Sequence, residues 1–411
     1  MRIKEFNSQA HTCARFAAIA LGFTIPISAP PLNYVLLALT LAALVAAGGF
    51  RENFACIKTN QVALAALALF GCLVIGVAWN ATGLESGLHM VEKYGDLAFV
   101  PIFAVLFRAE RDRRRAFLAF AAALALTLVL SYLIWAGLIS KGWTLLSEQA
   151  NPEVFKKYLT QNILMAFGAF LFACFALSAR TRRSRIAWSV LAALAAINVT
   201  LMVPGRSGQL IFAVLAIYFA YSVWRWRGTL LATVGVAALA CALMLGFAPA
   251  NSRTALMLEE WNTWQPGVDS QSSMGQRLGY FHNSLLIIRD HPIAGVGTGG
   301  FGKAYADKVA GTTFEPSVNP HNEYFNVTVQ LGLLGLSVML YLFYCIWRLA
   351  PALPTAFDRN LARGLLITIA VGCLLNSLLM DHVEGLFFAW ATGLLFAGLN
   401  PQAEKNSMAT P

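Results

Sequence analysis

Residues 61–79 read QVALAALALFGCLVIGVAW and contain no charged side chain. A helix rises about 1.5 Å per residue, so a run of this length crosses the roughly 30 Å of hydrocarbon in a lipid bilayer. Similar apolar runs recur between residues 14 and 398. The sequence therefore predicts an all-α polytopic membrane protein without a separate soluble domain.

The composition supports this class. Hydrophobic residues make up 58% of the chain and charged residues 12%, whereas soluble proteins are about one quarter charged. The net charge of +10 comes from short basic clusters between apolar runs. This distribution is typical of membrane topology signals, so we expect contact with membrane lipid and no nucleic-acid partner. The cysteines are scattered and form no C-x-x-C pair, so we predict no disulfide framework and no zinc site. No acidic triad or D-x-D pattern accompanies a candidate site, so we expect no other metal, and we also expect no cofactor.

The apolar runs predict about twelve transmembrane helices. They cover residues 14–29, 32–47, 61–79, 96–107, 116–139, 162–178, 186–203, 208–224, 230–247, 323–347, 361–379 and 383–398. We expect the first helix to be an uncleaved membrane helix, because another apolar run follows it at once.

The positions of Lys and Arg predict the orientation. With both termini in the cytoplasm and all twelve helices counted, about two thirds of the basic residues fall on the cytoplasmic side. The richest clusters lie at residues 108–115 and 180–185. Because omitting the short run 96–107 would move both clusters to the opposite side, we retain it as a helix.

This orientation divides the chain into four parts. Residues 1–247 hold the first nine helices, 248–322 form a long outside loop, 323–398 hold the last three helices and 399–411 form a cytoplasmic tail. Long loops in compact proteins are usually functional, so we expect the active site in the long loop. Within it, residues 275–290 have a helical pattern of apolar side chains.

Three arginines on the predicted outside are candidates for binding an anion. Arg206 lies in the short turn PGRSGQ, while Arg277 and Arg289 lie in the long loop. Arg206 could simply be an anchor at the lipid headgroups, and the other two could be solvated charges on an amphipathic helix. A guanidinium remains charged and presents a planar set of donors, which suits phosphate oxygens.

Gly295, Gly297 and Gly300 formally match the G-x-G-x-x-G pattern of dinucleotide-binding sites. That pattern requires a preceding strand and a βαβ unit, and neither is predicted here. We therefore expect a close-packed turn after the helix that ends near Pro292.

His321 is the candidate base. It lies in NPHNEYF, residues 319–325, immediately before a predicted transmembrane helix. An imidazole with an unperturbed pKa near 6.5 can accept a proton at neutral pH. A lone histidine is more often structural. Together with several outside arginines, however, His321 fits a site that holds a pyrophosphate and deprotonates a hydroxyl.

These motifs together resemble a known family. They are an outside arginine in a small turn, R-L-x-x-[FY] at residues 277–281, H-P-x-x-G-x-G-x-G-x-[FY] at 291–301, and P-H-N at 320–322 followed by Q-x-G-x-x-G at 330–335. The combination resembles the O-antigen ligase family, with the related O-antigen polymerases and O-linking oligosaccharyltransferases. The resemblance is tight over residues 199–340.

The resemblance implies a GT-C-like glycosyltransferase of lipopolysaccharide biosynthesis. Such an enzyme moves a preassembled glycan from undecaprenyl diphosphate to the lipid A-core, at the periplasmic face of the bacterial inner membrane. It implies that His321 is the general base and that the donor diphosphate is bound by Arg206, Arg277 and Arg289. It further implies metal-independent transfer with inversion.

We consider three further residues possible accessories to this site, namely Asn322, Tyr280 and Lys93. Lys93 belongs to an amphipathic stretch, residues 80–95, which is more typical of a lid or an interfacial anchor. The sequence leaves three alternatives to a ligase open. A polymerase would extend a second lipid-linked glycan, an oligosaccharyltransferase would modify a protein serine, and a transporter would move a lipid or glycan without chemistry.

Overall fold

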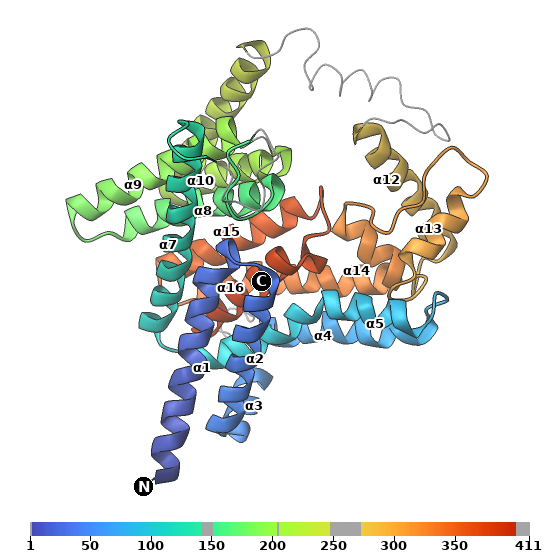
Figure 1. The fold of residues 1–411 in the computed structure, drawn as a ribbon, viewed down its shortest axis with the longest axis horizontal. Coiled ribbons are helices and arrows are strands. Elements are labelled where there is room, and N and C mark those ends of the chain that lie inside the picture. The colour runs from blue at the N-terminus through green and yellow to red at the C-terminus, as the bar shows by residue number, and fades with distance from the viewer. Residues whose placement is uncertain (1, 141–150, 204, 247–272, 400–411) are drawn as a thin grey trace.

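The computed structural model describes residues 2–140, 151–203, 205–246 and 273–399, which we call the described residues. Their regular elements are all helical (Figure 1). The first eight α-helices are α1 (Arg2–Ile27), α2 (Pro30–Ala47), α3 (Phe50–Lys58), α4 (Gln61–Gly76), α5 (Leu84–Lys93), α6 (Val100–Leu106), α7 (Glu110–Trp135) and α8 (Tyr158–Ser178). They are followed by α9 (Arg182–Ile197), α10 (Arg206–Gly246), α12 (Ser273–Asp290), α13 (Phe301–Val309), α14 (Glu323–Leu349), α15 (Ala356–Gly372) and α16 (His382–Phe396). Short helical turns are η1 (Val77–Trp79), η2 (Gly95–Phe99), η4 (Asn198–Met202), η5 (Ala350–Ala352) and η6 (Leu378–Met380).

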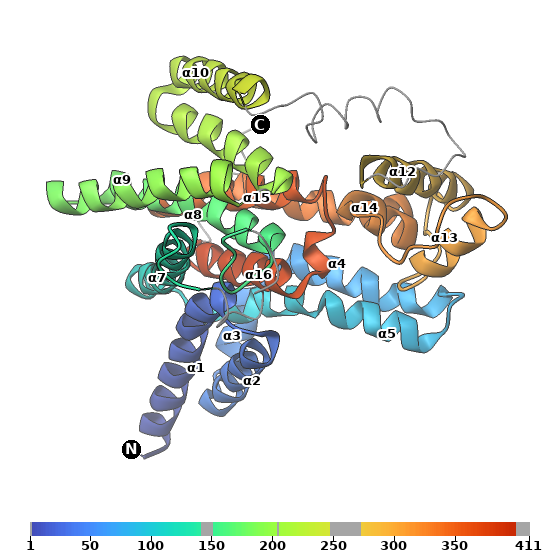
Figure 2. The ribbon, with the colours of Figure 1, turned by 45° about the horizontal axis from the view of Figure 1, so that its top comes forward.

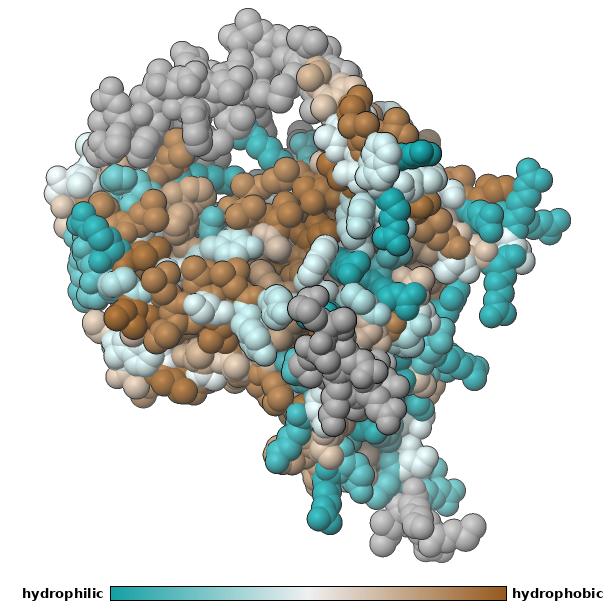
Figure 3. Space-filling model, turned by 180° about the vertical axis from the view of Figure 1, so that it is seen from behind, coloured by the Kyte–Doolittle hydropathy of each residue, from teal (hydrophilic) through white to brown (hydrophobic). Residues whose placement is uncertain are grey.

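Eight helices among the described residues are long and apolar enough to cross a membrane. They are Glu5–Ile27, Pro30–Ala47, Gln61–Trp79, Glu110–Trp135, Tyr158–Ser178, Arg182–Met202, Arg206–Ala238 and Glu323–Ala352. Two shorter apolar helices cover Gly95–Leu106 and His382–Phe396. On the face drawn in Figure 3, apolar side chains cover a broad middle region and hydrophilic ones gather toward its margins. The all-α membrane class is confirmed, while the count of twelve crossings and the GT-C-like likeness stay predictions.

Two predicted helices appear as one interrupted element. The runs 208–224 and 230–247 both lie in α10, except that residue 247 is outside the described residues. The helix breaks at Arg225, whose φ of 54° and ψ of −141° are not helical. Figure 2 shows the two halves of α10 running in different directions. Gly228 permits the sharp bend, because a Cβ there would lie 2.3 Å from the Ala220 carbonyl oxygen.

The prediction of a helix over residues 361–379 is wrong at the C-terminal end. The helix α15 stops at Gly372, and the chain continues through an irregular segment into η6. The segment contains Asn376 and Ser377, which make side-chain hydrogen bonds to other parts of the chain. Polar side chains with such partners favour irregular backbone over a continued apolar helix.

The core is centred on α16, whose aromatic side chains are fully buried. The Phe387 ring stacks on Phe120 of α7, with 5.1 Å between the ring centroids. Phe167 of α8 packs edge-on against Phe387, with 5.0 Å between the centroids. The Trp390 indole donates a hydrogen bond of 2.8 Å to the Ala18 carbonyl oxygen in α1. Since a short helix buried on all sides cannot face lipid, α16 organises the bundle around it.

Charged pairs join the ends of three helices. Arg113 of α7 contacts Asp358 of α15 at 3.0 Å, with both side chains almost fully buried. Arg15 of α1 contacts Asp112 at 2.9 Å. The basic segment 108–115 and the start of α15 therefore lie together.

A break in α14 accounts for the Q-x-G-x-x-G motif. Gly332 has a φ of 66° and a ψ of −166°, so the helix is interrupted there. The main-chain groups released by the break bond to the segment after α12. The Leu333 N–H donates to the Pro292 carbonyl oxygen at 2.8 Å, and the Val329 carbonyl oxygen accepts from the Val296 N–H at 2.9 Å. The two glycine motifs are thus partners in one tight junction.

The same glycine segment also binds α4. Thr298 donates from its hydroxyl to the Leu73 carbonyl oxygen at 2.7 Å and from its N–H to the Gly76 carbonyl oxygen at 3.0 Å. Gly297 has a φ of 89°, and a Cβ there would lie 2.6 Å from the Asn80 Cα. The predicted close-packed turn is confirmed, because only glycine permits this conformation and approach.

Candidate functional site

Arg206 is the first residue of α10 and is exposed. Its turn is tight because it packs against Asn162 of α8. A Cβ on Gly208 would lie 1.8 Å from the Asn162 Oδ1, and a Cβ on Gly205 would lie 2.9 Å from the same side chain. The glycines of this motif therefore let the chain reverse against α8 and present the Arg206 guanidinium at the helix start.

Arg277 lies in the first turns of α12 and is partly buried. Burial lowers the pKa of its guanidinium, and the positive charge of Arg206 lowers it further. The two arginines are thus close enough for their charges to interact, although about seventy residues separate them. Two like charges held together in a partly dry environment favour a polyanionic ligand.

His321 joins these arginines. Its imidazole keeps one side open to solvent, and its ring centroid lies 5.8 Å from that of Tyr280 on α12. Partial burial lowers the pKa of His321 below its ordinary value of 6.5, and the charge of Arg277 lowers it further. The imidazole is therefore neutral at neutral pH and able to accept a proton.

The backbone of His321 is in the left-handed region, with a φ of 52°. Few residues other than glycine adopt this conformation without support, and here Asn319 supplies it. The Asn319 Oδ1 accepts hydrogen bonds from the His321 N–H at 2.8 Å and from the Ser377 hydroxyl at 2.7 Å. The histidine is thus held at a defined position on its turn.

Asn322 has a positioning role. Its Oδ1 accepts from the Phe325 N–H at 3.0 Å and so caps the N-terminus of α14, while its Nδ2 donates to the Leu374 carbonyl oxygen at 2.9 Å. Because both ends of this buried amide bond to the protein, Asn322 fixes the chain next to His321.

The segment of residues 373–381 connects the two parts of the site, and the sequence analysis missed it. The Asn376 Nδ2 donates to the Ser207 hydroxyl at 2.9 Å, and the neighbouring Ser377 bonds to Asn319. The turn of Arg206 and the turn of His321 are therefore tied to consecutive residues. Two adjacent polar residues inside an otherwise apolar run were the available signal.

A buried polar network begins at Glu323, two residues after His321. The Glu323 carboxylate accepts hydrogen bonds from the Tyr94 hydroxyl and, at 3.0 Å, from the Leu379 N–H. Asn326 donates to the Tyr94 hydroxyl at 2.9 Å, and Gln330 donates to Asn326 at 3.0 Å. Fully bonded networks of this kind rigidify the elements they join, here the turn at Tyr94 after α5, α14 and the segment 373–381.

One predicted site residue, Arg289, lies apart from this group, and Lys93 lies at its edge. The helix α12 continues without a break to Asp290, so Arg289 is about 18 Å along the axis from Arg277. Its side chain is 74% exposed and contacts Asp290. Lys93 ends α5 and is partly buried, and its charge acts on Asp381 at the end of the segment 373–381. Among the described residues, no group of three or more His, Cys, Asp or Glu is placed to hold a metal ion.

The fold and site define a helical membrane protein that brings cationic groups and a neutral histidine together from three distant segments. Residues 191–340 match the model of a family described as O-antigen ligase. This match, which covers less than half of the chain, shows that these residues are similar to the O-antigen ligase family, and it confirms the predicted resemblance. It includes Arg206, Arg277, Arg289 and His321, and it excludes Lys93 and the segment 373–381. No curated protein matches the chain. The family match supports glycan transfer of the O-antigen ligase or polymerase type.

Proposed function

We propose that this protein is an O-antigen ligase. It transfers a preassembled glycan from undecaprenyl diphosphate to the lipid A-core oligosaccharide, at the periplasmic face of the bacterial inner membrane. The observation that carries this proposal is the grouping of Arg206, Arg277 and His321 within the residues that match the family. These are the groups that a diphosphate donor and a hydroxyl acceptor require.

Arg206 and Arg277 bind the diphosphate of the donor. When the bond between the anomeric carbon and the diphosphate oxygen breaks, the electron pair leaves with undecaprenyl diphosphate and negative charge grows on its oxygens. Fixed guanidinium groups stabilise that charge more strongly than water does, because they need no reorientation during the reaction. Arg289, about 18 Å farther along α12, would contact a part of the substrate beyond the diphosphate.

His321 acts on the acceptor. Its neutral imidazole takes the proton of the acceptor hydroxyl while that oxygen forms the new bond to the anomeric carbon. Positioned general bases contribute about 10²- to 10⁴-fold to rate. Attack from the side opposite the diphosphate inverts the anomeric centre. The charge of Arg277 keeps the imidazole neutral before reaction, and the Asn319 contact holds it on its turn.

The proposal also includes the topology. The short helices α6, α15 and α16 and both halves of α10 complete twelve crossings, with both termini in the cytoplasm. The site then lies on the periplasmic side, at the ends of α10 and α14. Tyr280 and Asn322 position His321, and Lys93 belongs to an interfacial helix at the edge of the site. The long loop 248–322 contributes α12 and α13, while its first part lies outside the described residues.

Two related enzymes use the same donor chemistry and remain candidates. An O-antigen polymerase would use a second lipid-linked glycan as acceptor, and an O-linking oligosaccharyltransferase would use a protein hydroxyl. A transporter of lipid or glycan would need none of the chemistry assigned to His321. Identification of the acceptor therefore separates these functions.

The test is reconstitution with undecaprenyl-diphosphate-linked glycan and lipid A-core, without added metal. We compare the wild type with His321→Ala and with His321→Asn, because asparagine tolerates the left-handed backbone better than alanine. Glycan transfer is followed by gel, and folding by thermal unfolding in detergent.

Transfer by the wild type, with loss of 10²-fold or more in both folded variants, is the expected result. Lengthening of the glycan on its carrier would indicate a polymerase, and modification of an added protein would indicate an oligosaccharyltransferase. Full transfer by a folded His321→Asn variant would show that His321 is not the base.

A further inference from the structure

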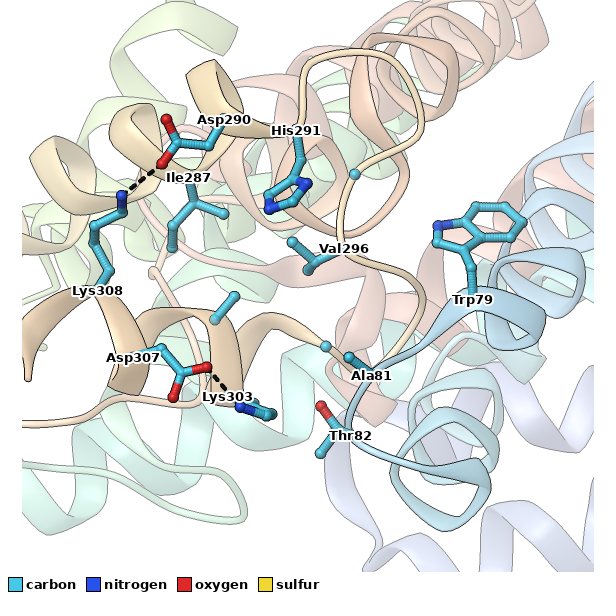
Figure 4. A pocket seen from close by; sticks show the side chains of 13 residues that line it. Trp79, Ala81, Thr82, Ile287, Asp290, His291, Val296, Lys303, Asp307 and Lys308 are labelled. Carbon is cyan, nitrogen blue, oxygen red and sulfur yellow. Dashed lines mark hydrogen bonds and ion pairs between the residues drawn. The ribbon is translucent and has the colours of Figure 1, made fainter.

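An open pocket with a volume of about 500 Å³ lies beside the C-terminal half of α12 (Figure 4). Its walls come from three parts of the chain, namely the end of η1 with the following turn, the end of α12, and the glycine segment with α13. The side chains that matter for recognition are Trp79, Asp290, Lys303, Asp307 and Lys308. Ligand sites typically combine an apolar wall with a few converging polar groups, as this pocket does.

The carboxylates and ammonium groups that line the pocket are equal in number. Lys308 contacts Asp290 at 2.6 Å, and Lys303 contacts Asp307 at 2.6 Å. Figure 4 shows the two pairs on the α12 and α13 walls. Asp290 also contacts Arg289, which lies outside the pocket lining, at 3.4 Å. A carboxylate can accept about four hydrogen bonds and an ammonium can donate three, so these ion pairs leave each group with capacity for a ligand. Equal numbers of both charges suit a neutral ligand rich in hydroxyl groups, in contrast to the cationic group at Arg206 and Arg277.

Trp79 supplies the apolar wall. Its side chain is held by a hydrogen bond of 3.1 Å from the indole N–H to the Ala294 carbonyl oxygen, yet the residue is 42% exposed. In Figure 4 the indole ring stands at one side of the pocket, across from His291. A sugar ring has a flat C–H face and a rim of hydroxyls. The fixed aromatic surface and the paired ionic groups are complementary to these two features.

The pocket and the His321 site are joined by α12. Tyr280 of α12 packs on His321, and Asp290 at the end of the same helix lines the pocket. Ten residues separate them, which corresponds to about 15 Å along a helix. Ile287 lines the pocket and packs in a small core with Phe301, Tyr305 and Phe314, so α12 and α13 form one unit.

We propose that this pocket is a saccharide-binding subsite, which holds sugar units of a glycan substrate remote from the reacting bond. This inference rests on the proposed function for the identity of the glycan. Two sources of saccharide are chemically equivalent here, the glycan of the donor and the oligosaccharide of the acceptor. The pocket would keep a long substrate aligned while the diphosphate and the acceptor hydroxyl meet near His321.

The test measures binding directly, without turnover. The probes are the free glycan released from its carrier and the core oligosaccharide released from lipid A, each titrated by calorimetry against the detergent-solubilised protein. We compare the wild type with Trp79→Ala, Trp79→Phe and the double variant Asp290→Asn with Asp307→Asn. Trp226→Ala is the matched control, because Trp226 is 67% exposed and lies in α10 away from the pocket.

We expect tenfold or more weaker binding of one probe by Trp79→Ala and by the carboxamide variant, a smaller loss in Trp79→Phe, and no change in Trp226→Ala. The probe whose affinity falls shows whether the saccharide in the pocket belongs to the donor or to the acceptor. In the transfer assay, the same variants should raise KM for that substrate and leave kcat within about threefold, because the chemistry lies elsewhere.

Unchanged binding of both probes by folded Trp79→Ala would overturn the subsite. So would the finding that the purified wild type carries a tightly bound phospholipid that Trp79→Ala alone releases, because the pocket would then hold a lipid. Failure of the proposed function has a different signature. If His321→Asn retains transfer while Trp79→Ala loses saccharide affinity, the catalytic assignment falls and the subsite stands.

Discussion

Two neighbours influence the backbone conformation and the pKa of His321. Asn319 accepts the His321 N–H and supports a left-handed backbone that histidine rarely adopts. Arg277, together with partial burial, lowers the pKa of the imidazole below 6.5. Neither effect follows from the letters P-H-N, since Arg277 lies 44 positions earlier in the chain. The presence of a candidate base could be predicted from the sequence, and its protonation state could not.

This arrangement predicts a shifted pH profile. A protonated imidazole cannot act as base, so kcat/KM falls as the pH drops through the pKa of His321, and in the wild type this decline should lie below pH 6.5. Arg277→Gln removes a like charge, which raises the pKa of His321, so the decline should move to higher pH. The measurement is the pH dependence of kcat/KM for glycan transfer.

Arg289→Gln is the matched control for this pH experiment, because Arg289 lies about 18 Å from Arg277 along α12. Its profile should coincide with that of the wild type. A shift of equal size in both variants would mean that the lowered pKa of His321 does not arise from Arg277.

At the scale of elements, the glycine motifs act in pairs. The break of α14 at Gly332 exposes main-chain groups that the segment after α12 then bonds, and Thr298 extends the junction to α4. Without this junction, the main-chain groups released by the break would have no hydrogen-bond partners in a membrane, where each unsatisfied group costs several kcal/mol. The glycines could be predicted to form a close turn. That two such motifs contact each other was not predictable, because each local pattern carries no information about its partner.

Gly332→Ala should destabilise the protein strongly. A Cβ there would lie 2.1 Å from the Ile293 carbonyl oxygen, and the φ of 66° is unfavourable for alanine. We expect a loss of about 3 kcal/mol or more, measured by denaturant unfolding in detergent. Gly71→Ala in α4 is the control, because nothing lies within 4 Å of its added Cβ. It should leave stability unchanged or raise it by about 0.5–1 kcal/mol. Equal stability of both variants would contradict the tight junction.

At the scale of the whole molecule, buried charges define how the helices assemble. Arg113 and Asp358 contact at 3.0 Å with side chains only 2% and 3% exposed, and they connect α7 with α15. Arg113 also donates to the Arg108 carbonyl oxygen at 2.9 Å. Because charges removed from water must be paired, this contact fixes the register of the two helices.

Asp358→Ala should cost about 3–5 kcal/mol of stability, since it leaves the Arg113 guanidinium buried without its partner. The double variant Arg113→Leu with Asp358→Leu removes both charges and should recover much of that loss. Thermal unfolding of the single and double variants measures the coupling. Additive losses would show that the pair contributes nothing beyond its separate parts.

The proposed topology predicts the labelling of introduced cysteines. In a variant that lacks the seven native cysteines, Lys303→Cys on α13 should react with a membrane-impermeant maleimide in intact cells whose outer membrane is made permeable. Arg183→Cys at the start of α9 should react only after the inner membrane is opened. Labelling of both sites in intact spheroplasts, or of Arg183→Cys alone, would exclude the proposed orientation.

By itself, the sequence determined the all-helical membrane class, the resemblance to the O-antigen ligase family, and the identity of the basic residues and histidine. Hydrophobic runs and short motifs are local signals, so they can be read along the chain. Only the tertiary structure decided that Arg277 lies near enough to Arg206 and to His321 for their charges to interact, that Arg289 lies apart, and that Asn376 and Ser377 tie the site together. These outcomes depend on contacts between segments far apart in sequence, and packing, rather than local pattern, selects such contacts.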